Sequence, residues 1–343
     1  MSSFVLRVDP QRPDPAVMAQ AALRLSRGEL VAFPTETVYG LGADALDADA
    51  VARIFAAKGR PAWNPVIVHI PDLRAARALA TEWPDSAQRL ADAFWPGPLT
   101  MVLPKRDIVP DITTAGLGAV ALRVPAHPVA LALLRAFGKP IAAPSANRFT
   151  QVSPTTAEHV VRSLGDRIGC VLDGGPCDVG IESTVIDLAG TVPTILRPGM
   201  ISRGQIEQVL QRPVDVVSKH VAAADVDIPG QRAPGMAERH YAPNADVWLF
   251  DSAQSDEISA ALAATPQNAS SAPVVTLLLH AVVPVEASDV VIRMPDDPQR
   301  YARALYAALH GADTHGARLV VIERPPDDDV WAAVRDRLAR AAR

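Results

Sequence analysis

The stretch GELVAFPTETVYGLG, residues 28–42, decides how the chain begins to fold. The apolar run ELVAF predicts a short buried strand, and a polar segment with two threonines and a glutamate follows at its end. Gly40 and Gly42 are expected to shape a bend there. Because α/β folds place their sites at strand ends, Thr35 and Thr37 become candidate site residues, while Glu36 could either orient the loop or meet a bound amine.

Outward from this stretch, predicted helices alternate with predicted strands. A helix with Asp14 as cap and Pro15 at its first position precedes it, and a second helix follows and ends at Gly59. Short apolar runs such as PVIVHI, LTMVL and AVALRV then predict strands, and a helix from Ser202 with Gln205 as capping-box partner closes the region. The pattern predicts an α/β fold.

The pattern changes near residue 246, where nearly continuous apolar strands alternate with helices and predict a small, Rossmann-like parallel sheet. No GxGxxG follows its first strand, so no dinucleotide is assigned to it. The intervening segment is rich in Pro, Gly and Ala, as a linker would be. We therefore expect a catalytic domain at 1–212, a linker at 213–245 and a C-terminal domain at 246–343.

The composition of the chain argues against several classes of protein. The chain has 343 residues, a net charge of -5 and two cysteines, and its basic and acidic residues are mixed. This argues against a nucleic-acid-binding tail, structural zinc and a disulfide framework. Neither a signal-peptide core nor a run of about 18 uncharged apolar residues occurs, so we expect a cytoplasmic protein without a membrane span.

Four polar clusters lie at expected strand ends: PTET at 34–37, KGRPAWNP at 58–65, PSAN at 144–147 and GIEST at 180–184. Each has an ordinary structural explanation as well. Lys58 and Arg60 flank a helix end, where cations offset the helix dipole. PSAN suits a turn, and a histidine on an apolar strand, such as His69, is more often a core residue.

Isolated cations at other strand edges support the alternative, that the KGRPAWNP cluster belongs to a site. Arg123 and Arg197, together with Asn64 and the cations of the KGRPAWNP loop, could hold a polyphosphate. There is no Walker A loop and Ser145 lies in no GxSxG elbow, so a nucleotide site would be built from dispersed side chains and a covalent hydrolase is disfavoured.

Taken in order, the motifs FPTETVYGLG, KGRPAWNPVIVHI, FWPGPLT, VALRVPAHP, PSAN, GIESTVID, ILRPG and PGMAERHYAP resemble the YrdC-like family in its longer, two-domain form. The resemblance implies a twisted, concave α/β N-terminal domain and a Rossmann-like C-terminal domain. It also implies a nucleotidyltransferase that combines L-threonine, bicarbonate and ATP into threonylcarbamoyl-AMP and pyrophosphate, for threonylcarbamoyladenosine modification of tRNA.

The resemblance implies roles for particular residues. Those expected to be catalytic are Lys58, Arg60, Ser145 and Asn147. Those expected to bind ATP are Lys58, Arg60, Asn64, Asn147, Ser153, Arg197 and Tyr241. Those expected to bind L-threonine are Thr35, Thr37, His69, Arg123, Ser145, Ser183 and Thr184, with Arg123 holding the carboxylate. His240 and Tyr241 could close the site as a lid.

Magnesium is expected with the triphosphate. No acidic cluster marks a protein metal site, which fits a metal held largely by phosphates and waters. Downstream tRNA threonylcarbamoyl-transfer proteins and a transient tRNA contact are the expected partners. Two alternatives stay open. One is a related carbamoyltransferase that uses carbamoyl phosphate, which normally carries zinc-finger and acylphosphatase-like segments; the other is an RNA-binding module, whose affinity would fall steeply with salt.

Overall fold

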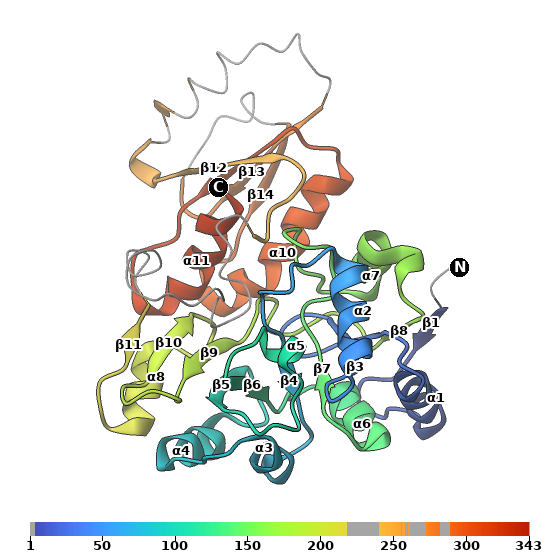
Figure 1. Ribbon diagram of the computed structural model, residues 1–343. Coiled ribbons are helices and arrows are strands. Elements are labelled where there is room, and N and C mark those ends of the chain that lie inside the picture. Colours follow the sequence, from blue (N-terminus) through green and yellow to red (C-terminus); the bar gives the residue numbers. More distant parts are fainter. Residues whose placement is uncertain are drawn as a thin grey trace. The chain divides into compact units, whose positions relative to one another are not determined.

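The computed structural model describes residues 4–217, 240–254, 256–257, 260, 272–281 and 289–342 (Figure 1). The described residues form two compact units. Unit 1 contains residues 4–149, 153–178 and 182–217, and unit 2 contains 150–152, 179–181 and the described residues from 240 onward. Most of the predicted linker at 213–245 therefore lies outside the described residues.

Unit 1 is built on an 11-stranded mixed sheet with the order β1-β8-β2-β3-β7-β4-β6-β5-β9-β10-β11. Its strands are β1 (Phe4–Arg7), β2 (Val31–Phe33), β3 (Gly40–Asp44), β4 (Ile67–His69), β5 (Leu99–Pro104), β6 (Ala119–Arg123), β7 (Ile141–Ala142), β8 (Cys170–Asp173), β9 (Thr184–Asp187), β10 (Thr194–Arg197) and β11 (Asp215–Val216). Its helices are α1 (Pro15–Ser26), α2 (Ala48–Lys58), α3 (Leu73–Leu79), α4 (Asp85–Phe94), α5 (Asp111–Thr114), α6 (Pro128–Phe137), α7 (Ala157–Leu164) and α8 (Arg203–Leu210).

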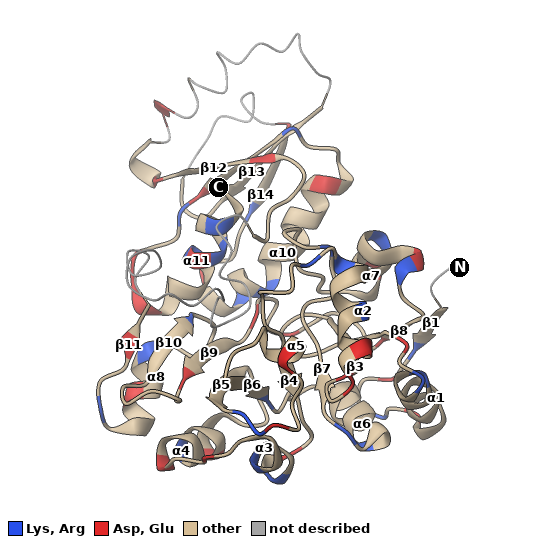
Figure 2. Cartoon of the chain, in the orientation of Figure 1, with Lys and Arg blue, Asp and Glu red and all other residues tan. Residues whose placement is uncertain are grey.

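Two apolar clusters pack helices against this sheet. The larger one joins α2, α4 and α8 to strands β4, β5 and β6 through residues such as Ile54, Leu90 and Val68. The other joins α1 and α6 to β2 and β8, with Phe33 among its buried members. Acidic and basic residues are dispersed over the helices (Figure 2), as the mixed charge pattern predicts.

Local signals set the helix ends as the sequence indicates. Asp14 accepts a hydrogen bond from the N–H of Ala16 at the start of α1, where Pro15 is the first residue. Ser202 and Gln205 form a complete capping box at α8. At the end of α2, Gly59 takes a left-handed conformation with φ 63°. These predictions are confirmed.

The expected bend at Gly40 and Gly42 is wrong, because both residues lie within strand β3, which pairs antiparallel with β2. A Cβ on Gly42 would approach Ile141 and Phe33 to 2.9 Å. The two glycines therefore allow side chains of the neighbouring strands to pack against the backbone of β3.

Unit 2 contains a parallel four-stranded sheet with the order β12-β15-β13-β14, which agrees with the predicted Rossmann-like character. Its elements are β12 (Asp246–Phe250), β13 (Val274–Leu278), β14 (Val290–Arg293), α10 (Pro298–Thr314), β15 (Leu319–Glu323) and α11 (Ala332–Ala341). Within the part of the chain that is described, no helix has the length and apolar character needed to cross a membrane.

Candidate active site

One face of the sheet at strands β4 and β6 carries two of the predicted polar residues. Alternate residues such as Val68, Met101 and Leu122 point into the larger apolar cluster. The other face therefore carries His69 and Arg123, whose backbones are register partners in the sheet. Farther along that face the residues are apolar, among them Val102 and Ala121, which divides it into a polar end and an apolar end.

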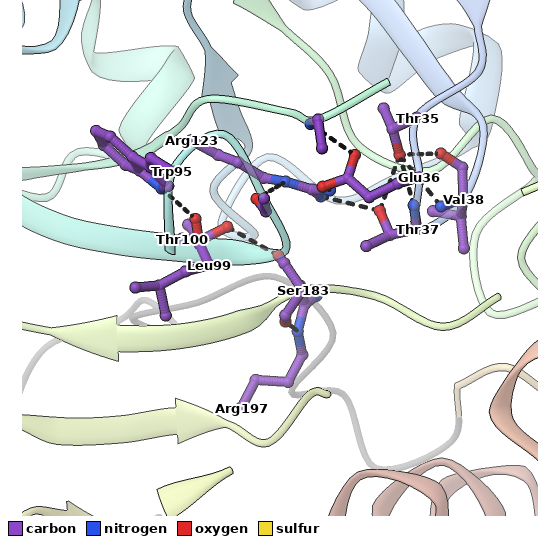
Figure 3. A network of polar contacts seen from close by, with 12 residues as sticks. Thr35, Glu36, Thr37, Val38, Trp95, Leu99, Thr100, Arg123, Ser183 and Arg197 are labelled. Atoms are coloured by element: carbon purple, nitrogen blue, oxygen red, sulfur yellow. Dashed lines mark hydrogen bonds and ion pairs between the residues drawn. The ribbon is translucent and has the colours of Figure 1, made fainter. Parts of the chain in front are cut away.

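The PTET loop is held by its own hydroxyl groups (Figure 3). Thr35 Oγ1 donates to the carbonyl of Val38 at 2.6 Å and accepts the N–H groups of Thr37 and Val38. The two threonine hydroxyls are 2.8 Å apart. Because Thr35 has already donated its only hydroxyl hydrogen, Thr37 must be the donor in that pair. Both hydroxyl hydrogens are thus committed to the shape of the loop.

Arg123 lies behind this loop and is almost completely buried. Its Nη2 is 2.7 Å from Glu36 Oε1, its Nη1 donates to Thr37 Oγ1 at 2.9 Å, and its Nε donates to the carbonyl of Gly97 at 3.3 Å. Glu36 Oε2 accepts the N–H of Ala126 at 3.1 Å. Glu36 therefore fastens the loop to the end of β6. Two of the five N–H groups of the guanidinium donate hydrogen bonds within the protein, and Nη2 forms an ion pair with Glu36.

His69 is a neutral imidazole in this structure. Burial, and then the positive charge of Arg123, lower its pKa from 6.5 to about 3. Its ring meets Phe33 edge-on, with centroids 6.1 Å apart, and its Nδ1 has no hydrogen-bond partner among the residues described. A neutral imidazole with a buried, unpaired nitrogen at the polar end of the sheet face is suited to accept or donate one hydrogen bond to a ligand.

The pKa of His69 predicts acid sensitivity. Between pH 6.5 and about 3 the unfolded chain binds a proton at His69 that the folded chain excludes. The free energy of unfolding should therefore fall with acidification, by about 1.4 kcal/mol per pH unit from this residue. Urea unfolding at a series of pH values should show a shallower acid loss for His69→Gln than for the unaltered protein; parallel curves would contradict the neutral buried state.

The cationic loop follows α2. Lys58 Nζ donates to the carbonyls of Ser145 and Asn147, each at 2.5 Å. Burial and the neighbouring Arg60 lower the pKa of Lys58 well below its ordinary value, and Glu182 acts in the opposite direction. The buried amino group thus ties the end of α2 to the PSAN loop.

Arg60 and Asn64 are paired within the same loop. The guanidinium of Arg60 donates to the side-chain oxygen of Asn64 at 2.6 Å and to the carbonyl of Pro65 at 2.7 Å. The amide Nδ2 of Asn64 is buried and has no hydrogen-bond partner within the described ranges. It is therefore a donor available to a ligand.

The GIEST segment supplies the third side of the site. Ser183 Oγ is 2.8 Å from Thr100 Oγ1 and accepts from Arg197 Nη2 at 3.2 Å (Figure 3). Arg197 also donates to the carbonyl of Ser183, through Nε at 3.1 Å and through Nη2 at 3.0 Å. Thr184 instead donates to the carbonyl of Ile201, which is a local structural contact.

Sequence reasoning assigned no role to Glu182 or Thr100. Glu182 accepts a hydrogen bond from Ser153 Oγ at 2.6 Å and acts electrostatically on Lys58. Its position next to Ser183 in the GIEST motif is a sequence feature that could have indicated a role in the site. Thr100 follows a tryptophan-proline segment on an otherwise apolar strand, and only its contact with Ser183 reveals it.

The apolar end of the sheet face opens into a cavity of about 370 Å³. Its walls include Pro65, next to Asn64, and Val102, Ala119 and Ala121 from strands β5 and β6. A mostly apolar cavity beside convergent polar groups has the size and character of a small-molecule site.

His240 and Tyr241 belong to unit 2. Their rings are 4.1 Å apart, and Tyr241 stacks on Tyr306 at 5.9 Å under the guanidinium of Arg337. Tyr241 is buried and has a left-handed backbone, with φ 62°. Their roles as a lid and in ATP binding stay predictions. Across the described part of the chain, no group of three or more His, Cys, Asp or Glu side chains could hold a metal ion.

Comparison with known proteins identifies the family. A family model described as "Telomere recombination", covering Sua5, YciO and YrdC, matches residues 24–199, and one described as "Threonylcarbamoyl-AMP synthase, C-terminal domain" matches residues 201–343. The threonylcarbamoyl-AMP synthase of Pyrococcus abyssi is 42% identical over 325 residues, which are 94% of this chain and 93% of that protein. The Bacillus subtilis protein of the same name is 42% identical over 332 residues, 96% of this chain and 93% of that protein.

A solved structure matches nearly the whole chain. The structure of Pyrococcus abyssi Sua5 complexed with L-threonine has a TM-score of 0.90 at 40% identity and covers 99% of this chain and 98% of that chain. The mixed sheet with its second, parallel-sheet unit defines a two-unit α/β protein of the YrdC-like class. The chain belongs to the Sua5/YciO/YrdC family, in the form that carries the threonylcarbamoyl-AMP synthase C-terminal domain.

Proposed function

We propose that this protein is a nucleotidyltransferase that makes threonylcarbamoyl-AMP and pyrophosphate from L-threonine, bicarbonate and ATP. The relatives that carry this name, and the relative solved with L-threonine, support the proposal. One observation in this chain carries it. The backbone of Ser145 forms an antiparallel β-bridge with Gly40, which follows the PTET loop, and the carbonyl of Ser145 accepts a hydrogen bond from Lys58. The hydroxyl-lined loop and the cationic loop thus meet at one residue.

The polar end of the sheet face is the proposed threonine pocket. Arg123 has N–H groups beyond its three protein contacts, and these would meet the substrate carboxylate. His69 and Ser183 would take the substrate hydroxyl and amine. Because Glu36 already neutralises part of the Arg123 charge, the pocket would favour a single carboxylate over a more highly charged anion.

The chemistry requires two anions to meet. The threonine amine first adds to bicarbonate, forming a carbamate with loss of water. A carbamate oxygen then attacks the α-phosphorus of ATP, the bond from that phosphorus to the bridging oxygen breaks, and pyrophosphate leaves. Lys58, Arg60 and the free amide hydrogens of Asn64 would stabilise this charge, and no covalent intermediate with the protein is needed.

The nucleotide base would enter the apolar cavity. That cavity begins at Pro65, whose carbonyl accepts from Arg60, so a phosphate bound at the cationic loop would bring the attached nucleoside beside it. Magnesium would travel with the triphosphate and neutralise charge there. Glu182 offers a nearby carboxylate, and phosphate oxygens and water would supply most ligands.

The product is a reactive mixed anhydride, so a tRNA threonylcarbamoyl-transfer protein must consume it. Direct, transient contact with tRNA is also consistent with a cytoplasmic role in tRNA modification. We include the transfer protein and the tRNA contact among the proposed partners.

Pyrophosphate release tests the function. The purified protein with ATP and magnesium should release pyrophosphate only when L-threonine and bicarbonate are both present, and Asn147→Ala should lose this release because Asn147 lies in the loop held by Lys58. Release without threonine would overturn the proposal. If carbamoyl phosphate replaced bicarbonate and threonine, the protein would instead be the related carbamoyltransferase.

A further inference from the structure

The last residue of β15, Glu323, is completely buried at the carboxyl end of the unit 2 sheet. Its Oε2 accepts three successive backbone N–H groups, from Leu279 at 2.6 Å, His280 at 2.9 Å and Ala281 at 2.9 Å. Its Oε1 accepts from Ser252 Oγ at 2.8 Å. All four donors therefore converge on one carboxylate.

Successive backbone N–H groups that point at one oxygen form an anion-binding concavity of the kind that holds phosphates. This one directly follows β13, at the strand ends where α/β sheets bind their ligands. Burial acts to raise the pKa of Glu323, but the hydrogen bonds from the 279–281 loop and Ser252 hold that pKa below its ordinary value. The group in the concavity is thus a full negative charge.

A second buried group lies near the same charge. The hydroxyl of Tyr301, in the first turn of α10, has no hydrogen-bond partner within the part of the chain described. Burial, and then the charge of Glu323, raise the pKa of Tyr301. It keeps its proton and is an uncommitted donor within the electrostatic reach of Glu323.

We propose that the 279–281 loop is an oxyanion-binding site of unit 2, which Glu323 fills as a built-in ligand. The site is shaped for a carboxylate or phosphate group. In the intact chain the tethered side chain has a far higher effective concentration than a free anion, so the site stays closed to nucleotide phosphates. In unit 2 the carboxyl ends of the strands, where α/β sheets usually bind ligands, are thus joined to one another: Glu323 at the end of β15 connects the segments that follow β12 and β13.

Chemical rescue tests this site. Glu323→Ala removes the built-in ligand and leaves the three N–H groups, so its thermal midpoint should fall. Formate or inorganic phosphate, compared with chloride at matched ionic strength, should then raise that midpoint by about 3 °C near saturation. The unaltered protein and Glu323→Gln, in which the site stays filled, are the controls. A rise with either anion that exceeds both controls supports the site, and no excess with either anion overturns it.

Glu323→Gln provides an independent test that does not need the alanine variant to fold. Because the pKa of Glu323 in the folded state is below the ordinary 4.5, its charge stabilises the fold fully above pH 4.5. That stabilisation disappears as pH falls through the folded value. The advantage of the unaltered protein over Glu323→Gln should therefore shrink on acidification, and a constant difference would overturn the proposal.

Discussion

Arg123→Met is expected to lower the free energy of unfolding of unit 1 by about 3–5 kcal/mol and to abolish threonine-dependent pyrophosphate release. The loss in stability follows because the buried Glu36 carboxyl group would lose the guanidinium that lies 2.7 Å away. The loss in activity follows because the proposed pocket would lose its carboxylate partner. Urea unfolding and the pyrophosphate assay measure the two effects separately.

The double variant Glu36→Leu, Arg123→Met separates a structural role from a functional one. Replacing both members of a buried ion pair by apolar residues is often neutral for stability. The double variant should therefore regain much of the stability lost by Arg123→Met, yet stay inactive. If it were no more stable than the single variant, the ion pair would not be the reason for the loss; if it were active, Arg123 would not bind substrate.

Lys58→Met is expected to lower turnover by a factor of about 10²–10³, the usual effect of removing one preorganised donor from a charged transition state. The carbonyls of Ser145 and Asn147 would also lose their common donor, at about 1–3 kcal/mol of stability. Steady-state kinetics should therefore show the change mainly in kcat.

Lys139 provides a control for the Lys58→Met variant. Lys139 is exposed and pairs with Asp44 at 2.7 Å, away from the loops of the site. Lys139→Met should retain normal kinetics. Equal losses in the two variants would show that removal of any lysine impairs the protein, and full activity of Lys58→Met would remove this ammonium group from the mechanism.

The sequence predicts the fold well and picks out the candidate site segments, for a physical reason. Caps such as Asp14 and Ser202 act within one turn of a helix, so their signals are local. The four polar clusters also stand out because each interrupts an apolar strand pattern. The clusters also occur in the order found in the family that the chain resembles. The matches to relatives along nearly the whole chain agree with this.

The sequence does not predict which partners these residues take. Glu36 and Arg123 are far apart along the chain, and no local pattern shows that one neutralises the other. Lys58 likewise binds backbone carbonyls, which every residue has, so its partners leave no mark in the sequence. Gly40 and Gly42 were misread because glycine is typical of bends, whereas here the packing of Phe33 requires it inside a strand.

The smaller unit draws on three separate stretches of the chain. Residues 150–152 and 179–181 belong to it, and Gly180 lies so close to α10 that a Cβ would approach the Cα of Arg303 to 2.5 Å. These two tripeptides directly precede Ser153 and Glu182, which bond to each other in unit 1. A fragment that begins after residue 217 would therefore lack residues 150–152 and 179–181, which pack in the C-terminal unit. That unit cannot be separated intact, or exchanged between proteins, by dividing the chain at a single position.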